Sequence, residues 1–184
     1  IDICIVDGTT GYSFVIGAPL SFAPIGAAGF PDGAYAVCWA DHFYVVDAPN
    51  NTMQSSGIDD STLWVALDFA SPESDPDGLV RVMSIQGTLY VMGKTTTEPW
   101  YYAANPTGFP FSANRNGIID MGLAARWGVA KADNTLYWLA QNKEGIFHAI
   151  LQDASRDFMN LLQASRQDQG NVTARISRLL ESLY

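Results

Sequence analysis

Three stretches of the chain share one order of apolar and polar positions: an apolar strand, a short polar turn, and a strand with an aromatic residue at its centre. They span residues 37–46, 82–92 and 129–139. The central tyrosines of the second strands are spaced by 46 and 47 residues and are Tyr44, Tyr90 and Tyr137. Blades of β-propellers repeat at periods of roughly 40 to 50 residues. The pattern therefore predicts a mostly β protein built from antiparallel, propeller-like blades.

Further strands are expected around these three hairpins. A third strand follows the second and third copies, at residues 100–103 and 146–150. Residues 1–6 and 12–16 have the pattern of the last two strands of a preceding blade. Three blades and a fragment do not close a ring, so the sequence predicts a partial ring with exposed edge strands unless further chain completes it. Because the chain begins at Ile1 within a strand pattern, we expect this start to be a cut inside a longer chain.

The connections between the predicted strands are of two kinds. Gln86-Gly87 and Asp133-Asn134 suit tight hairpin turns, because Gly and Asn tolerate positive φ. Three longer connections are rich in Pro, Gly and Asp and cover residues 19–33, 71–78 and 105–117. Connections of that length are usually functional or form interfaces.

The pattern changes after Asp153 to helical spacing, which divides the chain into a blade region, residues 1–153, and a C-terminal helical hairpin, residues 154–184. Asp153 or Ser155 can cap the first helix, and Asn171 can cap the second. The second helix carries an apolar stripe formed by Val172, Ile176, Leu179, Leu180 and Leu183. The stripe either packs on the chain's own sheets or docks to a neighbouring subunit. The residues predicted to form a partner interface are Phe158, Leu161, Leu162, Ile176, Leu179, Leu180 and Leu183.

Composition and charge exclude several classes of protein. Hydrophobic residues make up 48% and charged residues 16% of the chain, which excludes a disordered protein. No uninterrupted apolar run of about 18 residues is present, so no membrane partner is expected. The first 80 residues contain eleven acids and no Lys or Arg. Because gripping a phosphate backbone depends on Lys and Arg, we expect no sequence-specific nucleic-acid binding. The acids either keep the sheets soluble or keep DNA from sticking.

Two segments imitate binding motifs without completing them. Gly93-Lys94-Thr95 resembles the end of a phosphate-binding loop, but five residues separate Gly87 from Gly93 where the motif has four. Those residues, 88–92, are a predicted strand and not a loop, and Pro99 follows in place of a helix. Residues 73–78 imitate the start of a calcium loop, yet Ser84 stands where a Glu ligand is needed. A turn is therefore the favoured interpretation, and a cation held with help from Asp59, Asp60 or Asp68 is the alternative.

No catalytic, cofactor-binding or metal-binding residue is expected. His42 and His148 lack an adjacent nucleophile, and Cys4 and Cys38 have the pattern of small buried hydrophobes. Two alternatives remain open. Carboxylate pairs of a propeller glycoside hydrolase are recognised by spatial separation and not by sequence. Loop aromatics such as Trp100 and Phe109 are suited to stacking on sugars in a carbohydrate-binding propeller module, although packing in the sheet core is favoured.

Residues 66–77, 93–102 and 129–139 resemble, in this order, the packaged-DNA stabilisation proteins of short-tailed phages. These are tail hub or head-completion proteins, and the resemblance covers roughly residues 1–153. It implies a structural, non-enzymatic virion subunit that is repeated around the tail axis. Such a subunit joins the portal–adaptor assembly to the tail needle and tailspikes and helps to retain the packaged genome. The family is longer than this chain, and residues 154–184 depart from what the resemblance leads us to expect after the last blade.

Overall fold

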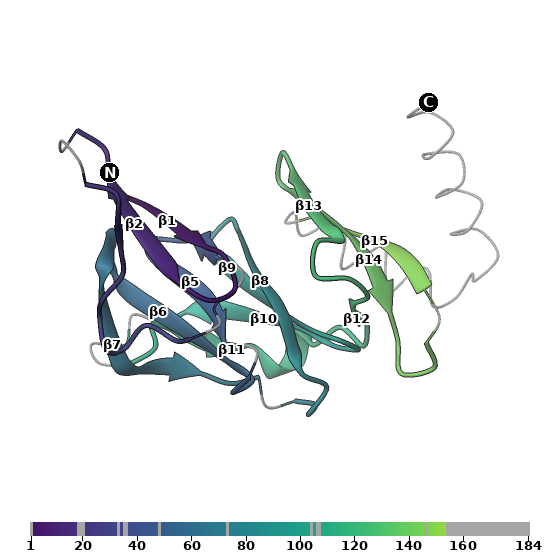
Figure 1. Ribbon diagram of the computed structural model, residues 1–184. Helices are drawn as coiled ribbons and strands as arrows, with labels where there is room; N and C mark the ends of the chain where they lie inside the picture. The colour runs from purple at the N-terminus through teal and green to yellow at the C-terminus, as the bar shows by residue number, and fades with distance from the viewer. Residues whose placement is uncertain are drawn as a thin grey trace.

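The strands of this computed structural model form four antiparallel sheets that follow one another along the chain (Figure 1). The structure describes residues 2–17, 21–32, 34, 37–47, 49–72, 74–103, 105, 108–145 and 147–153. The first sheet contains β1 (Asp2–Val6), β2 (Gly11–Val15) and β3 (Ala23–Pro24). The second contains β4 (Val37–Trp39), β5 (His42–Asp47), β6 (Thr52–Ile58) and β7 (Asp60–Ala70).

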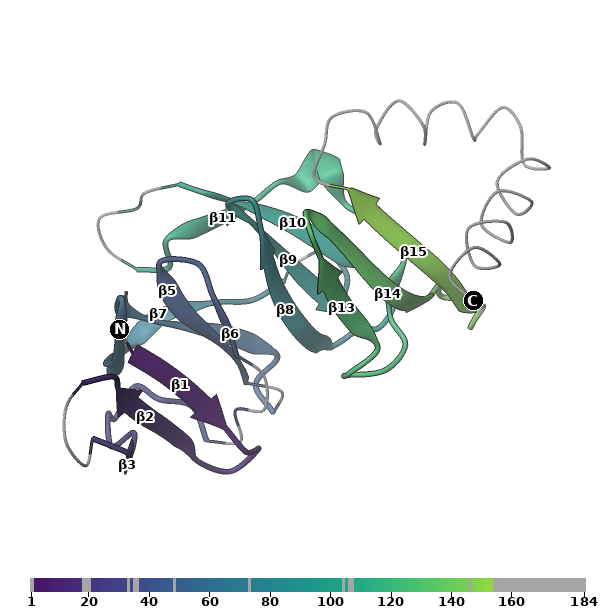
Figure 2. The ribbon, with the colours of Figure 1, turned by 90° about the horizontal axis from the view of Figure 1, so that it is seen from above.

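The third sheet contains β8 (Leu79–Ile85), β9 (Thr88–Gly93), β10 (Thr97–Tyr102) and β11 (Phe111–Ala113), and a short 3-10 helix, η1 (Arg115–Gly117), follows it. The fourth contains β12 (Gly122–Leu123), β13 (Val129–Ala132), β14 (Thr135–Gln141) and β15 (Phe147–Asp153). In the second and third sheets each strand pairs with the next one in sequence, as in a propeller blade. The described sheets make an open series and not a closed ring (Figure 2).

Three layers of apolar side chains lie between successive sheets. Phe43 and Val45 of β5 pack with Cys4 and Trp64 between the first and second sheets. The next layer is between the second and third sheets and contains Tyr44, Val46, Met53, Leu79, Val82, Leu89, Val91, Trp100, Phe109 and Phe111. The last lies between the third and fourth sheets and contains Ile85, Tyr90, Met92, Leu123, Leu136, Trp138 and Ala140. Each large side chain buried in this way contributes about 1.5–3 kcal/mol to stability.

The three repeated tyrosines occupy equivalent positions. Each lies on the second strand of a hairpin, namely β4–β5, β8–β9 or β13–β14. Tyr44 points into the layer shared with the third sheet, and Tyr90 points into the layer shared with the fourth. Because alternate residues of a strand face opposite sides, Leu136 and Trp138 face the third sheet and Tyr137 faces outward. The predicted repeat of blade-like hairpins is thus confirmed.

The tight turns predicted for two of these hairpins are also confirmed. Ile85 pairs with Thr88 across Gln86-Gly87, both with positive φ, at +46° and +74°. Ala132 pairs with Thr135 across Asp133-Asn134, where the φ of Asp133 is +51°. Positive φ at the turn matches the right-handed twist of the strands and sets the register of each hairpin.

Other expectations are corrected or lie outside the described residues. The connection predicted for residues 105–117 contains β11, the fourth strand of a sheet, because Phe111 continues the antiparallel pairing opposite Tyr102. Strands β6 and β7 complete the second sheet, although no strand was predicted there. The helical hairpin, with the predicted interface residues Phe158, Leu161, Leu162, Ile176, Leu179, Leu180 and Leu183, lies outside the described residues and stays a prediction. Among the described residues no helix is long and apolar enough to cross a membrane.

Candidate functional site

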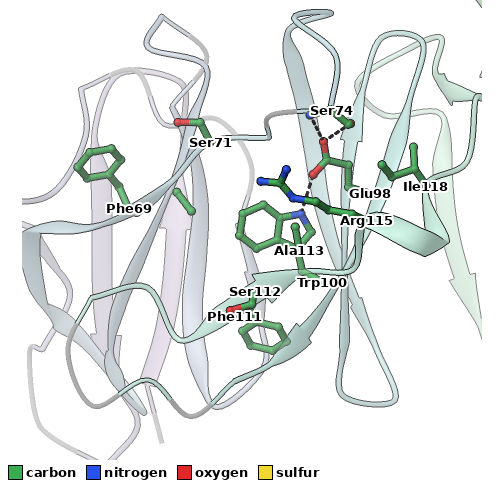
Figure 3. A pocket seen from close by; sticks show the side chains of 11 residues that line it. Phe69, Ser71, Ser74, Glu98, Trp100, Phe111, Ser112, Ala113, Arg115 and Ile118 are labelled. Atoms are coloured by element: carbon green, nitrogen blue, oxygen red, sulfur yellow. Dashed lines mark hydrogen bonds between the residues drawn. The ribbon is translucent and has the colours of Figure 1, made fainter.

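An open pocket of about 840 Å³ lies between the second and third sheets (Figure 3). Phe69 reaches it from the end of β7, Trp100 comes from β10, and Phe111 comes from β11. Glu98 and Arg115 are the charged side chains among the described lining residues. The remaining lining residues are Ala70, Ser71, Ser74, Ser112, Ala113 and Ile118.

The buried carboxylate of Glu98 is fully engaged by hydrogen bonds. The backbone N–H of Ser74 donates to Oε1 at 3.0 Å, and the Ser74 hydroxyl lies against the same oxygen. The indole Nε1 of Trp100 donates to Oε2 at 3.1 Å. Glu98 and Trp100 lie two positions apart on β10 and therefore share one face of the strand. Because a buried carboxylate is stable only when it is paired or hydrogen-bonded, this arrangement is structural and ties the 71–78 connection to β10.

The pockets do not offer the carboxylate pair that a glycoside hydrolase requires. Glu98 is the one carboxylate among the described residues of the first pocket. A second pocket, of about 430 Å³, lies at the hairpin turns, and Asp41 is its one carboxylate among the described lining residues. Glycosidases place two carboxylates about 5 to 9.5 Å apart across the scissile bond. Neither pocket therefore supports the hydrolase alternative.

The aromatic residues for which packing in the sheet core was favoured over stacking on sugars are core residues. Trp100 and Phe109 are 6% and 8% exposed, and their rings meet edge to face at 5.9 Å. Phe109 also packs on Tyr44, with ring centroids 5.6 Å apart. The favoured prediction of core packing is confirmed at these two positions, and the alternative of a sugar-stacking surface is not supported there, because the segment that carries Phe109 folds back onto the layer between the second and third sheets.

Asp77, in the segment that imitates a calcium loop, contacts the turn that resembles a phosphate-binding loop. Oδ2 of Asp77 accepts hydrogen bonds from the backbone N–H of Thr95 at 2.6 Å and of Thr96 at 2.8 Å. Both threonine hydroxyls donate to the same oxygen at 3.1 Å. Gly93 leaves room for this contact, because a Cβ at that position would collide with the Asp77 carboxylate and displace it. The turn that resembles a phosphate-binding loop therefore binds an anion of its own chain.

The same connection reaches the fourth sheet through Asp75. Its carboxylate forms an ion pair with Lys143, which lies between β14 and β15, and this hydrogen bond raises the pKa of Lys143. Asp75, Asp77 and Ser74 thus hold the 71–78 connection to its neighbours, and we call this set the clasp. Within the part of the chain that the structure describes, no group of three or more His, Cys, Asp or Glu side chains is arranged to hold a metal ion.

The histidines and cysteines show no catalytic arrangement among the described side chains. Nδ1 of His42 lies 2.6 Å from the backbone oxygen of Ser56, next to the irregular pairing between β5 and β6. Burial raises the pKa of the Cys4 thiol to about 12, so the reactive thiolate is scarce at neutral pH. Cys4 is therefore a small buried hydrophobe, as predicted. The side chains of Cys38 and His148 lie outside the described part of the structure.

A row of exposed apolar side chains runs along β7, the edge strand of the second sheet. Its members, at alternate positions, are Leu63, Val65, Leu67 and Phe69, which we call the β7 stripe. Leu67 is 77% exposed, and Phe69 extends the stripe into the first pocket. Large exposed apolar side chains that gather on an edge strand are typical of protein–protein contact sites. The sequence signal was the alternation of residues 63–69, which sequence reasoning did not use.

Comparison with known proteins identifies the family. Residues 32–154 match the sequence model of the phage stabilisation family, described as Bacteriophage P22 Gp10, beta-propeller. The match covers about two thirds of the chain and includes all three tyrosine-centred hairpins. A search of curated proteins gave no significant match. The chain therefore belongs to the phage stabilisation family of bacteriophage structural proteins.

Proposed function

We propose that this protein is a tail hub or head-completion subunit at the head–tail junction of a bacteriophage. In this role it joins the portal–adaptor assembly to the tail needle and tailspikes and helps to retain the packaged DNA. The observation that carries the proposal is the family match over the second, third and fourth sheets. The role is one of scaffolding and does not include catalysis.

The use of polar groups supports a scaffolding role. The buried carboxylate of Glu98 and the carboxylate of Asp77 hold backbone segments in place. Asp75, in the connection between the second and third sheets, forms an ion pair with Lys143 in the fourth sheet's loop between β14 and β15. A rigid series of blades transmits load between neighbouring proteins, whereas a catalytic carboxylate must be free to exchange a proton with a substrate.

The β7 stripe supports a role in assembly. An edge strand with four exposed apolar side chains favours aggregation of an isolated protein unless a partner covers it. Asp59, Asp60 and Asp68 flank or interrupt the stripe. A neighbouring tail protein that brings an apolar surface with basic residues at its rim would complement both features.

The negative charge of the chain supports a position beside DNA that the protein does not bind. The chain has a formal net charge of −9, and its first Lys or Arg is Arg81. Asp7, Asp32, Asp41 and Asp59 are exposed on the first two sheets and the segments beside them. A negatively charged surface repels the phosphate groups of DNA, so it encloses packaged DNA without binding it. A homo-oligomeric ring around the tail axis would also give each sheet edge a neighbour.

The test is reconstitution on phage particles that were assembled and filled with DNA in the absence of this protein. We expect the added wild-type chain to bind the particles and to reduce DNA loss. Leu67→Asp should abolish binding, because it places a charge in the centre of the β7 stripe. Ala66→Asp is the matched control, since it adds the same charge at the neighbouring exposed position and should bind normally. Wild-type chain that neither binds nor retains DNA would refute the proposal.

A further inference from the structure

The outward face of β13 and β14 carries apolar side chains that no described residue covers. In the second and third sheets the equivalent tyrosines, Tyr44 and Tyr90, are buried against the next sheet. In the fourth sheet Tyr137 is 44% exposed and Leu139 is 46% exposed. Ala130 pairs with Tyr137 across β13 and is exposed on the same face, together with Ala132. We call Ala130, Ala132, Tyr137 and Leu139 the open face.

We propose that residues 154–184 of this chain cover the open face, with the apolar stripe Val172, Ile176, Leu179, Leu180 and Leu183 packed on it. The position of the chain favours this occupant. β15 pairs with β14 from Phe147 opposite Gln141 to Asp153 opposite Thr135. The chain therefore leaves the sheet directly beside the open face, at the end next to the Asp133-Asn134 turn (Figure 2).

The length of the segment suits the dimensions of the face. The 31 residues after Asp153 include the apolar stripe, whose five members are spread over residues 172–183, a length of twelve residues. As a helix this stripe is about 18 Å long, at 1.5 Å per residue. The seven residues of β14 extend over about 23 Å, at 3.3 Å per residue. A helix about 10 Å in diameter spans two strands that lie about 4.8 Å apart, so one helix is wide enough for the open face.

The chemistry of the two surfaces also matches. None of the four side chains that define the open face is charged, and the two alanines among them leave room for branched residues. Helical spacing separates the apolar stripe from Arg178 and Glu181, which fall on the opposite side of the predicted helix. Apolar side chains would meet apolar side chains, and the charges would remain in water.

Covalent connection favours this segment over a free partner. A tethered segment acts at an effective concentration in the mM range, which is far above that of a second copy in dilute solution. A second copy, or a further sheet of the same kind, is the competing occupant. These occupants are distinguished by whether protection of the open face depends on protein concentration.

The first test measures the reactivity of Tyr137 by hydroxyl-radical footprinting of the full chain. We expect labelling of Tyr137 to rise several-fold in the double variant Leu180→Asp, Leu183→Asp. Glu181→Lys, on the opposite side of the predicted helix, should leave it unchanged. Tyr101 is exposed on β10 and provides the internal reference for labelling. Equal labelling of Tyr137 in the wild type and the double variant would overturn the proposal, as would protection that disappears on dilution.

The second test does not depend on the folding of that double variant. Leu139→Cys and Leu180→Cys are combined in a chain carrying Cys38→Ser and treated with a short bifunctional maleimide, since the buried Cys4 is unreactive. We expect a crosslink within one chain. The control pair, Leu67→Cys with Leu180→Cys, should not crosslink within a chain. No crosslink at the first pair, or a crosslink only between chains, counts against the proposal. Both tests use the isolated protein, so their outcome is independent of the hub role.

Discussion

The Glu98 carboxylate accepts a hydrogen bond at 3.1 Å from the indole nitrogen of Trp100, its neighbour two positions along β10. The other oxygen of Glu98 holds Ser74, which lies 24 residues away in the sequence. One side chain therefore positions a core aromatic residue and anchors the connection between the second and third sheets.

Replacement of Glu98 should therefore lower the free energy of unfolding. Glu98→Ala leaves the buried indole N–H of Trp100 without its acceptor, at about 1–3 kcal/mol, whereas the exposed donors of Ser74 can bind water instead. Urea unfolding should show a lower free energy of unfolding by this mechanism. Glu98→Gln keeps the shape and one acceptor oxygen and should lose less. Equal stabilities of the wild type and Glu98→Ala would show that these hydrogen bonds contribute nothing net.

Because the Asp77 carboxylate lies close to Gly93, a methyl group added at Gly93 should lower the stability of the protein. Gly93→Ala pushes the carboxylate away from Thr95 and Thr96, and such overpacking costs about 1–3 kcal/mol. Gly26→Ala is the matched control, because a Cβ there meets nothing within 4 Å. Thermal unfolding of the two variants compares the effects directly. A Gly93→Ala protein as stable as Gly26→Ala would contradict the clasp geometry.

Trp100 and Tyr101 are neighbours with opposite environments. Trp100→Ala removes a core side chain and should cost about 3–5 kcal/mol. Tyr101→Ala removes an exposed side chain and should change the free energy of unfolding by less than about 0.5 kcal/mol. Chemical denaturation measures both. A small effect of Trp100→Ala would mean that this indole does not contribute to the packed layer.

Cys4 gives a prediction for alkaline pH. Its folded pKa, about 12, lies above the usual value of 9.0 for an exposed thiol because the thiol is buried, so the unfolded chain loses this proton first. The contribution of Cys4 is complete below pH 9 and declines between pH 9 and 12, by about 1.4 kcal/mol per pH unit for one proton.

Two measurements check this. In a Cys38→Ser background, native protein at pH 8 should resist thiol reagents, and unfolded protein should react at once. The stability difference between this chain and its Cys4→Ala derivative should shrink above pH 9. Rapid labelling of the native thiol would contradict the burial of Cys4.

The repeated hairpins could be predicted from sequence because their signal is local. Strands β5 and β9 are buried on both faces and read as continuous apolar runs, and tight turns follow from Gln86-Gly87 and Asp133-Asn134. Strand β6 was missed because Gln54, Ser55 and Ser56 look like surface residues. In the fold they are buried, and their side chains are hydrogen-bonded to backbone atoms of the adjacent strands β5 and β7.

The clasp and the pocket could not be predicted because their partners are distant in sequence. Asp77 meets Thr95 across 18 residues, and Asp75 meets Lys143 across 68. Residue types alone imitate a calcium loop through the carboxylates of one segment and a phosphate loop through the Gly-Lys-Thr of the other, and the sequence does not show that the two segments contact each other. Only the folded register shows that one segment binds the other.

The sharing of β5 and β9 between adjacent apolar layers makes the series of sheets behave like a one-dimensional chain of coupled units. Each interior sheet is stabilised by two neighbours and each terminal sheet by one, so local opening should begin at the ends. Backbone amides of β1 and β2 should then exchange with solvent deuterium sooner than those of β9. The second and third sheets would be the last parts of this assembly to unfold.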